Sequence, residues 1–157
     1  MTKFRGLSIA AGAGVVVLFG SLAINHSAET TLPVPTGKFP VGRTTLDWVD
    51  DAPNTKRELL AWIWYPSEPS SVKEDYLTGP LRSEVDHDRG ILDGELLTRD
   101  LSKVHAHSFR NADVSRQQRS YPVVIMRGGA SLEVWNYSTL AEDLASHGYI
   151  VVGFDAP

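Results

Sequence analysis

Two adjacent glycines, Gly128 and Gly129, separate an apolar run from a predicted helix in the stretch IMRGGASLEVW, residues 125–135. Glycine lets a ligand approach the backbone closely, because no side chain intervenes. Backbone N–H groups at such a turn could bind a phosphate, a dinucleotide, or the oxygen anion that forms during acyl transfer. The structural alternative is a tight strand-to-helix turn that needs a positive φ.

Two of these chemistries do not fit the residues. A phosphate-binding loop would be longer and close with Gly-Lys-Ser or Gly-Lys-Thr, which is not present. A dinucleotide site would need Gly-x-Gly-x-x-Gly and an acidic residue after the next strand. Asp155 stands at that acidic position, but the glycine spacing is wrong. The oxyanion hole of an α/β hydrolase and the tight structural turn both stay open.

The turn must be positioned by the elements on either side of it. Tyr121–Met126 and Tyr149–Phe154 are short continuous apolar runs, typical of strands buried on both faces. Between them an amphipathic helix is predicted from Ser131, a fair N-cap, to His147, with Gly148 as its stop. This order predicts a βαβ unit with a parallel strand pair and a right-handed crossover.

The helix is predicted to face the core with its apolar stripe. Glu133 suits the positive end of the helix dipole. The stripe at helical spacing comprises Tyr137, Leu140, Ala141 and Leu144, and the predicted solvent face comprises Asn136, Thr139, Glu142, Asp143 and Ser146.

An antiparallel hairpin is predicted nearer the N-terminus. Val41–Asp50 and Arg57–Pro66 are rich in β-branched and aromatic residues, and a short polar turn joins them. Trp48, Trp62 and Trp64 fit the apolar face of this hairpin, so we expect them to pack in the core rather than to stack on a ligand.

Residues 67–119 show weaker patterns, namely a loop and then short helices broken at Gly90 and Gly94. On a strand, His105 and His107 would share one face, which is a spacing that metal ligands use. No third ligand accompanies them, so partly exposed loop histidines are expected. The charge run Glu84–Asp88 indicates a solvated surface rather than a metal site. We expect His147 to interact with terminal helix carbonyls and not to act as a catalytic base.

The N-terminus has the pattern of an export signal. Lys3 and Arg5 precede the uncharged residues 6–24, which are also long enough for a membrane anchor. Both interpretations, a signal and an anchor, place the remainder of the chain outside the cytoplasm. The protein would then be secreted, periplasmic or anchored to the membrane. We therefore expect a leader over residues 1–24, a Pro-rich linker over residues 25–38 and a folded domain over residues 39–157.

Composition excludes several classes of function. The chain has 157 residues and a formal net charge of -4, which fits one globular domain and gives no reason to expect nucleic acid as a partner. It contains no cysteine, so disulfides, thiolate catalysis and Cys-ligated zinc are excluded.

Several segments together resemble a known family. They are LPVPTGKFPVGRTTLDW, RELLAWIWYPSE and YPVVIMRGGAS…YSTLAEDLASHGYIVVGFDAP, within residues 32–157. The chain thereby resembles the platelet-activating-factor acetylhydrolase family, in its plasma-type and bacterial branch. The resemblance implies an α/β-hydrolase fold and serine-dependent hydrolysis of short acyl esters, for instance the sn-2 acetyl group of an ether phospholipid. It implies no metal and no organic cofactor.

The resemblance also assigns roles within the glycine turn. Gly128 falls where the family usually has His, Gly129 falls on the family's Gly, and Ala130 falls on the residue whose backbone N–H forms the oxyanion hole. Arg127 and Gly128 thus replace the usual pair, although Ala130 needs only its N–H for this role. Arg127 would suit an anionic substrate, or else a surface ion pair.

The remaining catalytic groups are not found in these residues. The family places its nucleophile in a Gly-x-Ser-x-Gly elbow followed by the acid and the His, and no such elbow occurs here. We therefore expect the N-terminal part of a hydrolase, inactive alone and poorly soluble, because the strand 121–126 would be an unprotected edge. The alternatives are a non-catalytic remnant or accessory interaction domain, and a dinucleotide-binding protein.

Overall fold

The computed structural model describes residues 17–50, 57–92, 98–129 and 132–155. Contacts within the chain divide it into two compact units. Unit 1 comprises residues 1–30 and 76–105, and unit 2 comprises residues 31–75 and 106–157. Unit 2 contains the glycine turn and most of the β-sheet.

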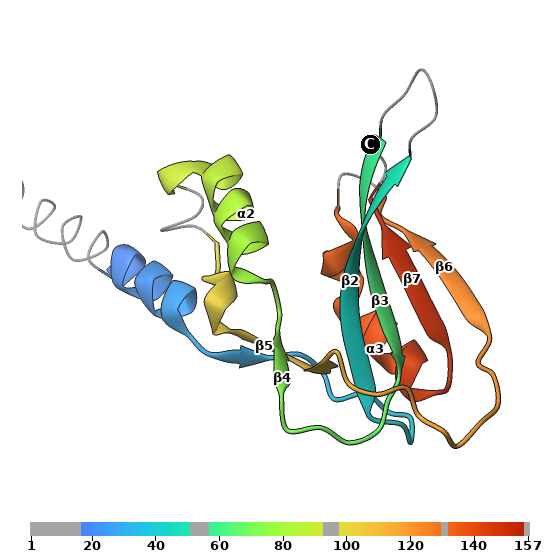
Figure 1. Ribbon diagram of the computed structural model, residues 1–157. Helices are drawn as coiled ribbons and strands as arrows, with labels where there is room; N and C mark the ends of the chain where they lie inside the picture. Colours follow the sequence, from blue (N-terminus) through green and yellow to red (C-terminus); the bar gives the residue numbers. More distant parts are fainter. Residues whose placement is uncertain (1–16, 51–56, 93–97, 130–131, 156–157) are drawn as a thin grey trace, which may run out of the picture. The chain divides into compact units, whose positions relative to one another are not determined.

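The sheet is mixed and follows the order β1-β5-β2-β3-β7-β6, with β4 paired to β5 off this path. Strands β2–β3 and β3–β7 pair antiparallel, whereas β2–β5 and β6–β7 pair parallel. Figure 1 shows β2, β3, β7 and β6 side by side, with α3 against one face. The strands are β1 Thr30–Thr31, β2 Val41–Asp50, β3 Arg57–Pro66, β4 Lys73–Asp75, β5 Val104–Arg110, β6 Val123–Arg127 and β7 Ile150–Phe154.

The predicted hairpin is confirmed, since β2 and β3 pair along all ten residues of each strand. Alternate residues of a strand share a face, so Trp62 and Trp64 point the same way. Both are fully buried, and their rings stack with centroids 5.9 Å apart. The core prediction is wrong for Trp48, which is 67% exposed. Trp48 pairs with Leu59, outside the segment of β3 that pairs with β7.

A buried charge lies beside this tryptophan pair. The Arg43 side chain is 1% exposed, and its guanidinium lies 5.1 Å from the Trp62 ring centroid. Its Nη2 atom is 3.7 Å from Oε1 of Glu74 and donates to the Asp75 carbonyl. Burial lowers the pKa of Arg43, and the carboxylate of Glu74 opposes that shift. The interior of the sheet therefore holds a paired cation that the hydrophobic pattern did not predict.

The predicted βαβ unit is also confirmed. β6 and β7 are parallel neighbours, and between them the chain forms the 3-10 helix η3, Val134–Tyr137, followed by α3, Ser138–Ser146. The helix ends before Gly148, whose φ of 98° is the left-handed conformation that favours glycine. Ser131, predicted as its N-cap, lies outside the described residues.

The predicted inward face of α3 is confirmed at Ala141 but wrong at Leu140, Glu142 and Ser146. Leu140 is 51% exposed, whereas Glu142 and Ser146 are fully buried. The buried positions are Ser138, Ala141, Glu142, Ala145 and Ser146. Small side chains fit here because Trp62 and Trp64 already fill the sheet face against which the helix packs. Glu142 is stable in this position because its Oε1 accepts from the backbone N–H groups of β5 residues 107 and 108 at 3.0 and 2.8 Å.

Part of the predicted linker is bonded to α3. The Thr36 backbone N–H and hydroxyl both donate to Asp143 Oδ1, at 2.7 and 2.8 Å. The Gly37 N–H donates to Ser146 Oγ at 2.9 Å, and the Phe39 N–H donates to the Ser146 carbonyl at 3.0 Å. The extended segment before β2 is thus fixed along the C-terminal half of the helix.

One face of the sheet is only partly covered by the described residues. The prediction that the strand at 121–126 is buried on both faces is wrong, because Val123 and Ile125 of β6 are 57% and 64% exposed. Leu46, on the same sheet face, is 54% exposed. α3 packs on the opposite face, and β6 is the last described strand in the order. β6 is therefore an edge strand with one open apolar face.

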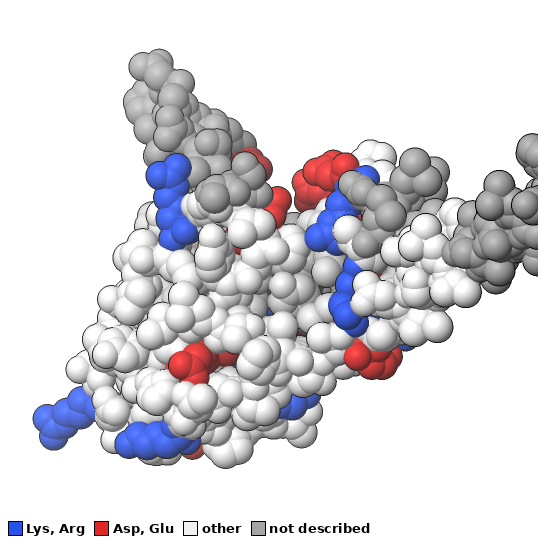
Figure 2. All heavy atoms as spheres, turned by 180° about the vertical axis from the view of Figure 1, so that it is seen from behind, with Lys and Arg blue, Asp and Glu red and all other residues white. Residues whose placement is uncertain are grey.

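Charged side chains are mixed on the surface. On the face drawn in Figure 2, acidic and basic groups are interspersed between wide uncharged areas. Charges of opposite sign at short range weaken each other's field, so this face does not present a field of one sign.

Unit 1 is mainly helical. Residues 17–27 form a helix, α2 spans Gly79–Leu92, and the short η2 spans Leu101–Lys103. The predicted break at Gly90 is confirmed by its φ of 72°, whereas Gly94 lies outside the described residues. The Arg99 guanidinium donates to the Ala28 carbonyl at 2.8 Å, which ties the two parts of this unit together. Among the described residues, no helix has both the length and the apolar composition needed to cross a membrane.

Candidate functional site

The glycine turn lies where β6 and β7 end together. Arg127, the last residue of β6, pairs with Phe154, the last residue of β7. The chain then turns back, and the Leu132 N–H donates to the Gly129 carbonyl at 3.0 Å across an antiparallel bridge. The carboxyl ends of parallel strands are where open α/β sheets bind ligands. The predicted turn therefore lies at the edge of the sheet where α/β folds generally bind ligands.

Gly128 is required by space and not by backbone conformation. A Cβ atom there would lie 2.6 Å from the Leu132 carbonyl oxygen and 2.7 Å from Asp155 Oδ1. It would also lie 3.1 Å from the Val134 nitrogen. The positive-φ explanation is wrong, because the described glycines with positive φ are Gly90 and Gly148. At Gly129, by contrast, a Cβ would meet nothing within 4 Å.

Asp155 directly follows β7 and lies beside Gly128 of the turn. Its Oδ1 accepts a 2.6 Å hydrogen bond from the Val134 N–H, the first N–H of η3. Glu133 is the N-cap of η3 but makes no side-chain capping bond, so Asp155 caps this helix from a distant position in the sequence. Partial burial raises the pKa of Asp155, and the bond from Val134 opposes that rise.

The residue to which the family resemblance assigns the oxyanion N–H, Ala130, lies outside the described residues. Residues 130–131 are both outside the described part, and the described residues before and after them fix the two ends of the turn. Gly128 begins it against β7, where its N–H lies 3.5 Å from the Phe154 carbonyl oxygen. Val134 ends it at the first turn of η3. Arg127, the candidate for contact with an anionic substrate, is exposed at the end of β6.

The histidine pair lies on β5, but its two imidazoles have different partners. Nε2 of His105 is bonded to the Glu29 carboxylate, and Nε2 of His107 is bonded to the Leu32 carbonyl oxygen at 2.7 Å. His147 Nε2 lies 2.9 Å from the Thr36 hydroxyl, so its side chain contacts the N-terminal segment instead of the helix carbonyls.

The charge run at residues 84–88 lies on α2, with its acidic side chains and His87 exposed as expected for a solvated surface. In the described parts of the chain, no three His, Cys, Asp or Glu residues gather as a metal site would require.

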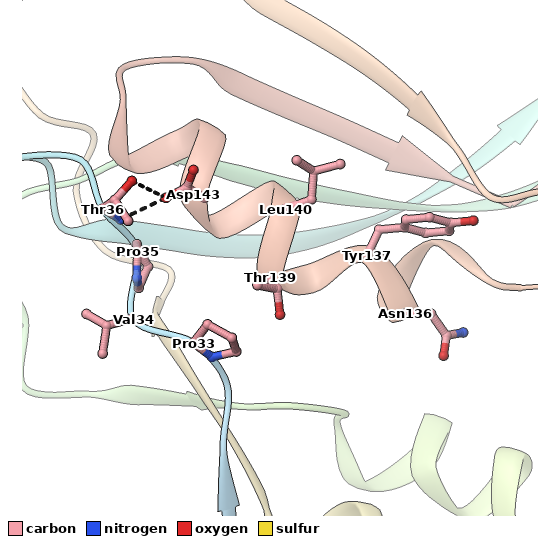
Figure 3. Close-up of a pocket in the computed structure, with 9 residues that line it drawn as sticks. All are labelled: Pro33, Val34, Pro35, Thr36, Asn136, Tyr137, Thr139, Leu140 and Asp143. Atoms are coloured by element: carbon pink, nitrogen blue, oxygen red, sulfur yellow. Dashed lines mark hydrogen bonds between the residues drawn. The ribbon is translucent and has the colours of Figure 1, made fainter.

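A separate pocket of about 450 Å³ lies along the outer side of α3 (Figure 3). Its carboxylate, Asp143, is already bonded to Thr36. None of its residues belongs to the glycine turn, so the pocket is a distinct surface feature. It is lined by Pro33, Val34, Pro35, Thr36, Asn136, Tyr137, Thr139, Leu140 and Asp143.

Comparison with known families identifies the fold that carries this turn. The family model described as platelet-activating factor acetylhydrolase, isoform II, matches residues 24–155. The chain belongs to this family. The resemblance stated from the sequence is confirmed, and so is the α/β-hydrolase fold class. The comparison with curated proteins finds no match.

A solved structure agrees with the family assignment. The chain is similar to a ferulic acid esterase from Streptomyces cinnamoneus, with a TM-score of 0.64 and 29% sequence identity. The match covers 82% of this chain and 36% of that chain, so these residues span about a third of the esterase. The family and this neighbour are both named for enzymes that hydrolyse esters.

Sequence reasoning found the turn but missed the groups that hold it. From the sequence, Asp155 was considered only as the acidic residue of a dinucleotide site. Its position after the second strand, at the same sheet edge as Gly128, was a signal that could have predicted its role. Glu142 was assigned to solvent because a charged residue on a helix is normally exposed. The acetylhydrolase-family chain uses both carboxylates to accept backbone N–H groups.

Proposed function

We propose that this chain supplies one side of the oxyanion hole of a serine-type carboxylic ester hydrolase that acts on short acyl esters. One observation supports the proposal above the others. A glycine turn with no room for a side chain at Gly128 follows β6, in a chain of the acetylhydrolase family. That is the strand–helix loop from which α/β hydrolases donate an N–H to the tetrahedral intermediate.

The roles within the turn are those that the family resemblance implies. Ala130 donates its backbone N–H to the oxyanion, and Gly128 and Gly129 let the turn lie close to the substrate. The second N–H of an α/β-hydrolase oxyanion hole belongs to the residue after the nucleophile. The 157 residues contain no Gly-x-Ser-x-Gly sequence. The proposal therefore requires the serine, its acid and its His to come from polypeptide outside them.

The substrate class is tested with a panel of esters and the polypeptide that contains these residues and a Gly-x-Ser-x-Gly elbow. p-Nitrophenyl acetate reports hydrolysis of a short acyl ester, and a 2-acetyl ether phospholipid reports the family's named activity. Methyl ferulate reports the activity named for the structural neighbour. Hydrolysis of the acetyl esters in preference to methyl ferulate is expected. No hydrolysis of any panel member would overturn the proposal.

The role of Ala130 is tested by removing its N–H. Ala130→Pro deletes the donor and should lower kcat by about 10²–10³, the usual cost of losing one oxyanion donor. Ala130→Gly keeps the N–H and serves as the matched control, with kcat close to wild type. Equal activity of the two variants would exclude this assignment.

A second candidate function is a non-catalytic interaction module. The open apolar face that carries Leu46, Val123 and Ile125 favours it, because monomeric proteins seldom leave a contiguous apolar patch uncovered. The two candidates differ in one measurement. An interaction module would bind its partner with the same affinity after Ala130→Pro and would show no ester hydrolysis.

We also propose export of the protein, on sequence grounds alone. Lys3 and Arg5 ahead of the uncharged residues 6–24 have the pattern of an export signal or an anchor. The proposed membrane association runs through the same residues. Cell fractionation with sequencing of the mature N-terminus tests this, and an intact N-terminus in the cytoplasmic fraction would contradict it.

A further inference from the structure

Asp155, directly after β7, is bonded to one end of the glycine turn and lies beside the other end. Its Oδ1 accepts from the Val134 N–H at 2.6 Å, on the far side of the turn. The same oxygen occupies the space beside Gly128, where it would lie 2.7 Å from an added Cβ atom. The missing side chain at Gly128 and the carboxylate of Asp155 thus complement each other.

Other features of the described residues reinforce this arrangement. Arg127 and Phe154 close the parallel ladder directly before Gly128 and Asp155. The Leu132 N–H donates to the Gly129 carbonyl at 3.0 Å, so the turn is closed on itself before it reaches Val134. Among the hydrogen bonds described above, the bond of Asp155 is the one through which a side chain joins the end of β7 to η3.

We propose that Asp155 is a positioning residue that holds the glycine turn at the end of β6 in its oxyanion-binding geometry. The inference rests on the proposed function. Asp155 acts through the backbone: by fixing the Val134 N–H it fixes the direction in which the chain leaves the turn.

Small displacements of the turn should matter for catalysis. Oxyanion donors act at 2.7–3.1 Å from the developing anion, and their effect depends on their being fixed before the reaction. A misplacement of about 1 Å can reduce the rate about 100-fold. Loss of the bond between Asp155 and Val134 would allow a displacement of that kind without removing any group that touches the substrate.

The bond can be broken from either side. Asp155→Ala removes the acceptor, and Asp155→Asn keeps a side-chain oxygen that accepts the same N–H. Val134→Pro removes the donor. Proline suits the backbone of this position because Val134 is the first residue of η3 and Glu133 before it has φ −72° and ψ 158°, an extended conformation that proline favours in its predecessor. Val134 is also fully buried, so Val134→Ala, which keeps the N–H, is the control for lost packing.

The test is a double-mutant cycle in the polypeptide with the Gly-x-Ser-x-Gly elbow, with p-nitrophenyl acetate as the probe. Asp155→Ala should lower kcat about 10- to 100-fold, with KM within about threefold of wild type. Asp155→Asn should retain most of kcat. Val134→Pro should lower kcat to a similar extent, and adding Asp155→Ala to it should cause little further loss.

The outcomes separate this inference from the proposed function. An active wild type whose kcat is unchanged by Asp155→Ala overturns the role of Asp155 alone. Fully additive losses in the cycle also overturn it, because the two groups would then act independently. Should Asp155→Ala fail to fold, Asp155→Asn and Val134→Pro still decide the question: equal kcat for both overturns the inference. A wild type that hydrolyses no ester overturns the proposed function, and this role with it.

Discussion

Replacement of Gly128 by alanine tests whether close packing determines the glycine turn. The new Cβ atom would lie 2.6 Å from the Leu132 carbonyl oxygen and 2.7 Å from Asp155 Oδ1. Carbon and oxygen atoms do not approach so closely without displacement of one of them. Leu132 contributes backbone that is already bonded to Gly129, and Asp155 is held by its bond to Val134. Neither group is a flexible chain end that can move away at little cost.

The expected cost follows from these contacts. Overpacking at a constrained site destabilises by about 1–3 kcal/mol, and two contacts below 3 Å place Gly128→Ala toward the upper end of that range. Gly129→Ala is the matched control, since nothing lies within 4 Å of its added Cβ and its φ is not positive. That variant should be neutral or more stable by up to about 1 kcal/mol, because alanine restricts the unfolded chain.

Chemical denaturation of the two variants and of wild type, in the polypeptide with the elbow, measures the difference. Initial rates with p-nitrophenyl acetate show whether the turn has also moved. Adding Asp155→Ala should not restore Gly128→Ala, because the contact with the Leu132 carbonyl remains. Equal stability of Gly128→Ala and Gly129→Ala would refute the packing argument, and so would full rescue by Asp155→Ala.

Three further predictions concern the body of unit 2. Glu142→Ala should destabilise the fold by about 3 kcal/mol, because it leaves two backbone donors of β5 and a buried hydroxyl without their acceptor. Glu142→Gln keeps an acceptor oxygen and should cost less. Denaturation curves for both variants check this. Hydrogen bonds from Thr36 hold the pKa of Asp143 below its usual value, so their stabilisation is present above the unfolded pKa and is lost as the pH falls through the lower folded pKa. Thermal melts from pH 5 down to pH 2 should show this loss in wild type, and Asp143→Asn should remove that part of the pH dependence. The 157-residue chain alone should aggregate through its open sheet face, and Ile125→Lys should reduce light scattering; a soluble wild-type monomer with a sharp melt would contradict this.

The elements with strong local patterns could be predicted from the sequence. The hairpin was predicted with the observed bounds, because a run with β-branched residues and a run rich in aromatic residues flank a polar turn. The parallel pair of β6 and β7 followed from two apolar runs joined by a helix of suitable length. In both cases the residues that specify the element are neighbours in the sequence.

Predictions failed where distant residues decide the outcome. The buried face of α3 was predicted only at Ala141, because a pattern on the helix does not show that Trp62 and Trp64 fill the opposing sheet face. Glu142 is buried because β5, a strand with a weak pattern, presents two N–H groups to it. The role of Asp155 depends on two strand ends that meet in space. Arg127 pairs with Phe154, which is 27 residues away in the sequence. No single stretch of sequence contains that information.

The bonds between the N-terminal segment and α3 have a consequence for the order of folding. Thr36 and Asp143 are 107 residues apart, and Gly37 and Ser146 are 109 apart, whereas the hairpin strands are joined by a short turn. Contacts between distant residues carry the entropy of closing a long loop, so they form after local contacts. The segment before β2 should therefore dock onto α3 only once the hairpin and the βαβ unit exist. In unfolding it should be the first part to separate, so a protease that cuts near residue 35 would detect that opening before the sheet melts.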